Sequence, residues 1–131
     1  MPRLLLVDDD TDLRQLLARA LAQFGHDVVE AGNGHEAMAH LRGDPPDLVI
    51  TDINMPEMDG IEIINEVQAV GPPIPIIAMS GGGRIPKELL LANAGVLGAV
   101  VTLQKPFKLA ALLAAVEGLL PGGGNRRASL R

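Results

Sequence analysis

The chain has 131 residues and a formal net charge of −5, with no cysteine and two aromatic residues, Phe24 and Phe107. This length fits one domain with a single core, which must be built from aliphatic side chains. The lack of cysteine excludes disulfides, thiolate metal sites and thiol nucleophiles, and the negative charge argues against direct nucleic-acid binding. Since no apolar stretch approaches the roughly 20 residues that span a bilayer, we expect a cytoplasmic protein without membrane insertion.

The first part of the chain alternates strand and helix patterns. An apolar run at residues 3–7 predicts a strand. Residues 11–24 predict a helix, because apolar side chains recur there with the spacing of one helical face: Leu13, Leu16, Leu17, Ala20, Leu21 and Phe24. Gly25 is suited to end this helix. Residues 27–31 then predict a second strand, and residues 34–42 a second helix with three inward residues, Ala37, Met38 and Leu41.

The alternation continues to residue 120. The remaining predicted elements are a strand at 47–51, a helix marked by Ile61, Ile64 and Val67, a strand at 74–79, a helix from 86 to about 93, a strand at 99–103 and a helix at 108–120. This order predicts an α/β fold with a three-layer, doubly wound, five-stranded parallel sheet and right-handed crossovers. We expect one domain over residues 1–120. Residues 121–131 begin with proline and three glycines and predict a flexible C-terminal tail.

Polar residues stand where four of the predicted strands end. Asp8 and Asp9 follow the first apolar run, Asp52 the third, Ser80 the fourth and Lys105 the fifth. The carboxyl ends of parallel strands meet at one edge of the sheet, where open α/β sheets bind their ligands. The sequence therefore predicts three carboxylates, a hydroxyl and an ammonium at one edge, which is a suitable set for a cation and a phosphoryl group.

Four separated motifs give the chain a family resemblance. They are the pair Asp8-Asp9, the segment at 52–60 (Asp-Ile-Asn-Met-Pro-Glu-Met-Asp-Gly), Ser80 and the corner Lys105-Pro106-Phe107. In this order they resemble a response-regulator receiver domain, the phospho-acceptor module of two-component signalling, over residues from about 4 to 120. The resemblance implies the flavodoxin-like strand order 2-1-3-4-5.

The resemblance also implies a metal site. Adjacent carboxylates repel one another in an empty site, and Mg²⁺ relieves that repulsion while it keeps several of its waters. By the match, Asp9 ligates Mg²⁺ directly, Asp8 acts through water, and Asp52 and the backbone carbonyl of Asn54 complete the protein ligands.

The phosphoryl chemistry is assigned in the same way. An aspartate can attack phosphorus when the charge on the transferring group is neutralised, and the match makes Asp52 the phospho-acceptor. Lys105 is then a point charge for one phosphoryl oxygen and Ser80 a hydrogen-bond donor to another. Taken alone, Ser80 beside three glycines is equally consistent with an ordinary loop residue. The chain is expected to catalyse only its own phosphorylation and dephosphorylation.

Other interpretations stay open at this point. Asp10 to Asp12 suit a helix N-terminal cap. The run Asp8-Asp9-Asp10-Thr11 superficially fits a haloacid-dehalogenase-type phosphatase, but that class leaves Asp52 and the segment after it unexplained. The chain also fits a receiver fragment of a larger response regulator or hybrid kinase. None of His26, His35 and His40, which lie in loop or helix-surface contexts, is assigned a catalytic role.

The expected partners are a histidine kinase or phosphotransfer protein on one side and a downstream target or a second copy on the other. The second surface is expected on the fourth helix, fifth strand and fifth helix, because residues 108–120 carry only two charged side chains. Receivers often have an aromatic residue three positions before the lysine, and Thr102 stands there instead. A switch that turns an aromatic ring inward is therefore excluded at this position.

Overall fold

Five parallel strands form the centre of the protein. The computed structural model describes residues 2–53, 60–69, 74–81 and 100–120. Within them the elements are β1 (Arg3–Val7), α1 (Thr11–Gln23), β2 (Asp27–Ala31), α2 (Gly34–Gly43), β3 (Leu48–Asp52), α3 (Gly60–Ala69), β4 (Ile76–Ser80), β5 (Val100–Gln104) and α5 (Leu109–Leu119). The helix predicted from residue 86 to about 93, the tail at 121–131 and Asn54 lie outside the described residues.

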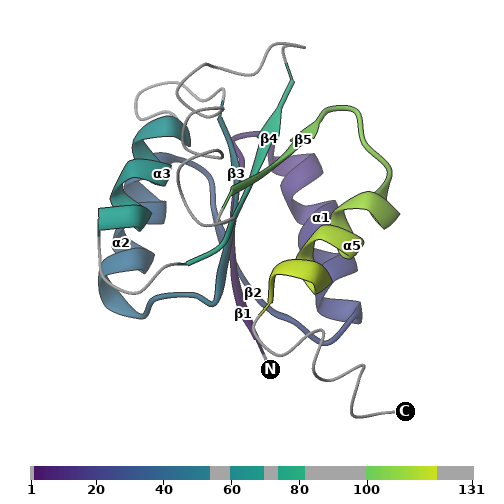
Figure 1. The fold of residues 1–131 in the computed structure, drawn as a ribbon, viewed down its shortest axis with the longest axis horizontal. Coiled ribbons are helices and arrows are strands. Elements are labelled where there is room, and N and C mark those ends of the chain that lie inside the picture. Colours follow the sequence, from purple (N-terminus) through teal and green to yellow (C-terminus); the bar gives the residue numbers. More distant parts are fainter. Residues whose placement is uncertain (1, 54–59, 70–73, 82–99, 121–131) are drawn as a thin grey trace.

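The sheet has the predicted order, β2-β1-β3-β4-β5, and every described strand pair is parallel. Figure 1 shows α1 and α5 on one face of the sheet and α2 and α3 on the other. The three-layer, doubly wound architecture is thus confirmed. In this arrangement both faces of the central strands are covered, which explains why their sequences are apolar almost without interruption.

The core is divided by the sheet into two layers. Alternate residues of β1 point to opposite faces: Leu5 and Val7 pack into one layer, and Leu4 and Leu6 into the other. The first layer is completed by side chains from α2 and α3, including Ala37, Met38, Leu41, Ile63 and Val67. The second is completed by side chains from α1 and α5, including Leu17, Leu21, Leu112 and Val116. The inward residues predicted for α2 are confirmed.

Local signals set the ends of α1. The Asp10 carboxylate accepts a hydrogen bond from the Leu13 N–H at 3.1 Å and caps the helix N-terminus. At the other end Gly25 has φ 89°, a left-handed conformation that costs glycine little. The predicted cap and the predicted stop are both confirmed, and together they aim α1 away from the carboxyl end of β1.

Three strands are displaced toward the C-terminus relative to the prediction. β3 begins and ends one residue later than 47–51, β5 one residue later than 99–103, and β4 covers 76–80 rather than 74–79. The reason is the ladder register, because Asp52 pairs with Met79 and Ser80 with Gln104. Polar residues that were expected just beyond the strands are therefore part of them, which holds their backbones in place.

The outer surface of α1 was predicted less well. Leu16 and Phe24 were assigned to its buried face but are 60% and 63% exposed, while Ala18 is buried. The stripe that packs into the second core layer consists of Leu17, Ala18 and Leu21, with Ala20 also buried and Leu13 partly buried against the same layer. His26, expected in a loop or helix-surface context, lies in the loop before β2 but is buried, with its Nε2 atom 3.7 Å from Glu117 Oε2. In the part of the chain that the structure describes, no helix is long and apolar enough to span a bilayer.

Candidate functional site

The carboxyl ends of β1, β3, β4 and β5 bring the predicted polar residues to one edge of the sheet. Asp8 follows β1 directly, Asp52 and Ser80 are the last residues of β3 and β4, and Lys105 follows β5. Backbone hydrogen bonds continue past the strand ends: the Asp8 N–H donates to the Ala31 carbonyl at 3.1 Å, and the Lys105 N–H to the Ser80 carbonyl at 2.7 Å. The site residues are therefore carried on rigid backbone rather than on free loops.

Three carboxyl groups converge at this edge. Oxygens of Asp8, Asp9 and Asp52 all lie within 4.8 Å of one another. Asp8 is 0% exposed and Asp52 5%, whereas Asp9 is exposed. Carboxylate oxygens are hard ligands that suit Mg²⁺ or another hard divalent cation. The donor set therefore fits the metal that the sequence predicted, with one acid open to solvent and two held inside.

Lys105 supplies the positive charge of the site. Its Nζ atom donates to Asp8 Oδ2 at 2.9 Å and to Asp52 Oδ2 at 3.4 Å, and its side chain is 21% exposed. Burial by itself lowers the pKa of Lys105, but the hydrogen bond to Asp8 and the charges of Asp52 and Asp8 outweigh it and hold this pKa above its ordinary value of 10.5. The lysine thus stays charged and neutralises part of the acidic cluster.

Asp8 is held through all of its polar groups. Besides the Lys105 contact, its Oδ1 atom accepts from the Asp10 N–H at 3.0 Å, and its backbone carbonyl accepts from Arg14 Nη1 at 2.9 Å. With the Asp8 N–H bonded to Ala31, no atom of Asp8 is available to move without losing a bond. Asp8 is therefore a fixed element of the site, and the exposed Asp9 is the acid with room to meet an ion.

The remaining predicted positions are placed less fully. Ser80 is buried at the end of β4, next to the strand that carries Asp52. Thr102 is half-buried in β5 and pairs with Ala78, so a hydroxyl stands at the position discussed above for an aromatic ring. Arg14 was not singled out from the sequence, where an arginine in the first turns of a helix gives no signal of its own.

An apolar groove adjoins the acidic cluster. It has a volume of about 640 Å³ and shares Lys105 with the edge just described, and Gly81, which follows Ser80, also lines it. The exposed Leu16, which the helical pattern had assigned to the core, instead lines the wall of this groove. The full lining comes from α1, the residue after β4, the corner after β5 and the start of α5: Leu13, Leu16, Leu17, Gly81, Lys105, Pro106, Phe107 and Leu109. The Lys105–Pro106 peptide in this corner is cis.

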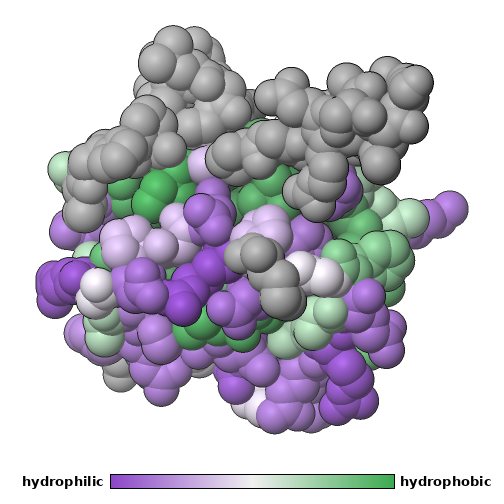
Figure 2. Space-filling view, turned by 90° about the horizontal axis from the view of Figure 1, so that it is seen from below, coloured by the Kyte–Doolittle hydropathy of each residue, from purple (hydrophilic) through white to green (hydrophobic). Residues whose placement is uncertain are grey.

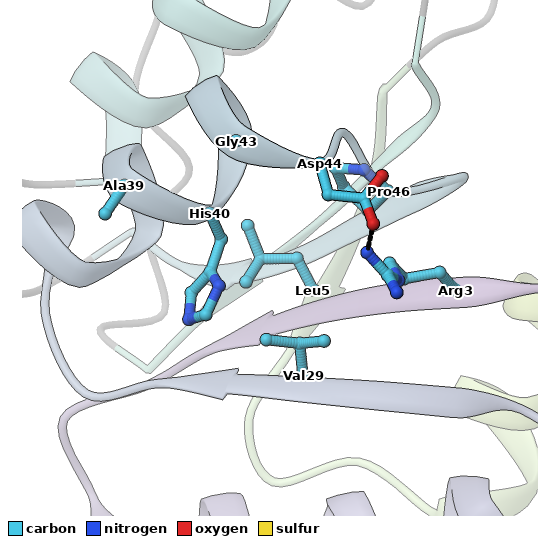
Figure 3. A pocket seen from close by; sticks show the side chains of 8 residues that line it. All are labelled: Arg3, Leu5, Val29, Ala39, His40, Gly43, Asp44 and Pro46. Carbon is cyan, nitrogen blue, oxygen red and sulfur yellow. Dashed lines mark hydrogen bonds and ion pairs between the residues drawn. The ribbon is translucent and has the colours of Figure 1, made fainter.

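A second pocket lies between the start of β1 and the end of α2, at the opposite edge of the sheet. Its volume is about 230 Å³, and Figure 3 shows Arg3 at its mouth, bonded to Asp44, with Leu5 and Val29 as its apolar floor. Arg3 Nε also lies 3.6 Å from Asp27 Oδ2, so the charge of this arginine is already compensated.

Figure 2, seen from below, shows a mainly hydrophilic surface with smaller apolar areas. Among the described residues, the group of three acids whose oxygens all lie within 4.8 Å of one another is the one at the other edge, Asp8, Asp9 and Asp52.

Comparisons with known proteins agree with this geometry. Residues 4–117 match the family model of the response regulator receiver domain. The chain is 35% identical over 128 residues to the transcriptional regulatory protein PrrA of Mycobacterium tuberculosis, and the matched region covers 98% of this chain and 54% of PrrA. It is 39% identical over 117 residues to the transcriptional regulatory protein GlrR of Escherichia coli, covering 89% of this chain and 26% of GlrR. The chain therefore spans about half, or less, of the length of these relatives.

Solved structures give the same result. The chemotaxis protein CheY4 of Vibrio cholerae superposes with a TM-score of 0.78 at 30% identity, covering 92% of this chain and 99% of CheY4. The receiver domain of NtrX from Brucella abortus superposes with a TM-score of 0.77 at 31% identity, covering 89% of this chain and 97% of that domain.

Proposed function

The chain belongs to the response-regulator receiver domain family, and we propose that Asp52 is its phospho-acceptor, with Mg²⁺ bound beside it. One observation carries this assignment: Asp52 is buried at the carboxyl end of β3 with Asp8 and Asp9 within 4.8 Å and the Lys105 ammonium 3.4 Å from its Oδ2 atom. Asp8 shares the cluster and lies nearer to Lys105, at 2.9 Å, but it is fully buried and both of its carboxylate oxygens accept hydrogen bonds, from Lys105 and from the Asp10 N–H, which makes it the less suitable nucleophile.

The proposed reaction is an in-line transfer. A carboxylate oxygen of Asp52 forms a bond to phosphorus while the bond between phosphorus and the donor nitrogen of a phosphohistidine breaks, and the electron pair of that bond returns to the imidazole. The product on Asp52 is an acyl phosphate. Dephosphorylation is the attack of water on the same phosphorus, which releases inorganic phosphate and regenerates the carboxylate. The donor is a histidine kinase or a phosphotransfer protein.

Lys105 and Ser80 are proposed to receive the transferred group. The Lys105 ammonium already reaches Asp52 Oδ2, so an oxygen of a phosphoryl group on Asp52 would lie within its range after a small movement. A point charge there lowers the energy of the charge that develops on the equatorial oxygens. Ser80, at the end of the neighbouring strand, is the proposed hydroxyl donor to a second oxygen.

The metal would be held mainly by Asp9, with Asp52 and the backbone of Asn54 as further ligands and Asp8 acting through water. When bound, Mg²⁺ supplies positive charge to the phosphoryl oxygens. The acids contribute in a different way, since Asp8 keeps Lys105 aimed at the site and Asp9 provides the exposed carboxylate.

This chemistry makes the chain a signalling module rather than a metabolic enzyme. Its proposed output is a surface around β5 and α5, where Leu109, Ala110, Ala111 and Ala114 are exposed. The bound target is a downstream protein or a second copy of the chain, and a cytoplasmic location agrees with both. The relatives named above are longer transcriptional regulators, so a receiver joined to an output domain is the second arrangement to be considered.

Mass spectrometry of the intact protein provides the test. The chain is incubated with acetyl phosphate, with and without Mg²⁺, and also with a phosphohistidine donor. We expect one added phosphoryl group that requires Mg²⁺ and is absent in Asp52→Asn. Labelling of Asp52→Asn to the wild-type extent would move the acceptor elsewhere, and hydrolysis of small phosphate esters with turnover would instead favour a phosphatase.

A further inference from the structure

Arg14 links the acidic loop after β1 to the end of β2. Its Nη1 atom donates to the Asp8 carbonyl at 2.9 Å and its Nε atom to Glu30 Oε1 at 3.0 Å, while its side chain is only 16% exposed. One guanidinium therefore holds a backbone oxygen inside the acidic site and a side chain outside it. This differs from an ordinary surface ion pair, which joins two mobile side chains.

The carbonyl that Arg14 holds belongs to the peptide unit between Asp8 and Asp9. The preceding peptide is fixed as well, because the Asp8 N–H donates to Ala31 at 3.1 Å. With both peptides fixed, the direction in which the chain leaves Asp8 is determined, and so is the starting point of the exposed Asp9 side chain. We propose that Arg14 is a positioning residue that sets the place of Asp9 as a ligand for the divalent cation.

The end of β2 is shaped to receive this guanidinium. A Cβ atom at Gly32 would stand 3.0 Å from Arg14 Nη1, so any larger residue there would press on the arginine. The Gly32 N–H in turn donates to Glu36 Oε1 at 2.6 Å, which keeps this turn in place. A planar fork with several donors in fixed geometry suits two separate acceptors, the Asp8 carbonyl and the Glu30 carboxylate, whereas a lysine would have to reach both from one nitrogen atom.

The inference rests on the proposed cation site, and it predicts a defect in metal affinity without a matching loss of fold. Outer contacts of this kind typically change metal affinity about tenfold or more. Arg14→Gln should weaken Mg²⁺ binding about tenfold, Arg14→Lys should recover only part of the loss, and Glu30→Gln should cause a smaller loss in the same direction. Arg19→Gln, an exposed position on the same helix, is the matched control and should bind as wild type.

Calorimetric and amide NMR titrations with Mg²⁺ alone provide the measurement, with thermal unfolding of each metal-free variant beside it. A second set of variants carries Asp9→Asn in addition. In a protein that already lacks the Asp9 carboxylate, Arg14→Gln should cause no further loss of Mg²⁺ affinity, whereas a purely structural role of Arg14 would cause the same loss as before. Equal affinities of Arg14→Gln and wild type, or equal losses in both backgrounds, would overturn the positioning role while leaving the acceptor assignment intact. A wild type that binds no Mg²⁺ would overturn both. Should Arg14→Gln fail to fold, Glu30→Gln decides the question in the same cycle.

Discussion

The Lys105 ammonium donates to the Asp8 carboxylate at 2.9 Å although the two residues are 97 positions apart in the chain. The contact connects the end of β1 to the corner after β5, and Asp52 on the intervening β3 lies 3.4 Å from the same nitrogen. One cation thus unites the acids that come from two different strands.

The two adjacent acids should differ in their effect on stability. Asp8→Ala removes the buried partner of Lys105 and the acceptor for the Asp10 N–H, which should lower the free energy of unfolding by about 1–3 kcal/mol. Asp9→Ala removes an exposed acid from a repulsive cluster, so the metal-free protein should unfold at or above the wild-type denaturant midpoint. Urea titration without metal makes the comparison, and an Asp9→Ala protein that is the less stable of the two would contradict it.

Mg²⁺ titration should separate the same two variants in another way. Asp9→Ala should lose most of the affinity for Mg²⁺, since it removes the proposed ligand that faces solvent. Asp12→Ala, an exposed acid in the first turn of α1, serves as the control for a general loss of negative charge and should bind nearly as wild type. If both variants weaken binding equally, the ion is attracted by net charge rather than held by Asp9.

Alkaline pH should reveal the contribution of Lys105. Because the folded-state pKa lies above the ordinary value of 10.5, the stabilisation is complete below about pH 10.5 and is lost as the pH rises through the raised value. In Lys105→Met the difference in stability from the wild type should therefore shrink above pH 10.5. Chemical unfolding of both metal-free proteins between pH 8 and the alkaline limit of folding provides the check. If the difference in unfolding free energy between them stays constant over this range, the ion pairs of Lys105 are not its source.

Lys105 should also be needed for the response to phosphorylation. Lys105→Met should remain folded, but beryllofluoride with Mg²⁺ should shift its amide NMR spectrum much less than that of the wild type, because the proposed point charge for the phosphoryl oxygens is missing. Lys108→Met, which changes the next lysine along the chain, an exposed one, is the control. A full wild-type response of Lys105→Met would remove the lysine from the switch.

The exposed face of α5 should mediate association. Ala110 and Ala114 are one turn apart and both exposed, so Ala110→Glu with Ala114→Glu places charge on that face without touching the buried Leu112 and Val116. In light scattering with beryllofluoride we expect the wild type to form dimers and the double variant to stay monomeric. Ala22→Glu on α1 is the control. A wild type that is monomeric in both states, and whose target binding survives the double substitution, would exclude this surface.

The order and type of the described elements could be predicted because they depend on short-range periodicity. Continuous apolar runs indicated buried parallel strands, and Asp10 and Gly25 marked the ends of α1 through local hydrogen bonding and backbone freedom. The site followed from the same reading, since polar residues at the ends of parallel strands share one edge whatever the details of packing. The motifs, and not the periodicity, supplied the strand order that the structure confirms.

Other features depend on contacts between distant residues and could only come from the tertiary structure. Helical spacing placed Leu16 and Phe24 with the core, but the direction of α1 on the sheet leaves both exposed and buries Ala18 instead. His26 is buried, and α5, some ninety residues later, brings Glu117 beside it. The position of Asp8 is decided by Ala31, Arg14 and Lys105, which come from three separate parts of the chain. The sequence by itself therefore determined which residues reach the edge of the sheet, because that is a property of each strand, whereas the burial, pairing and charge balance of those residues were decided by the packing of the whole chain.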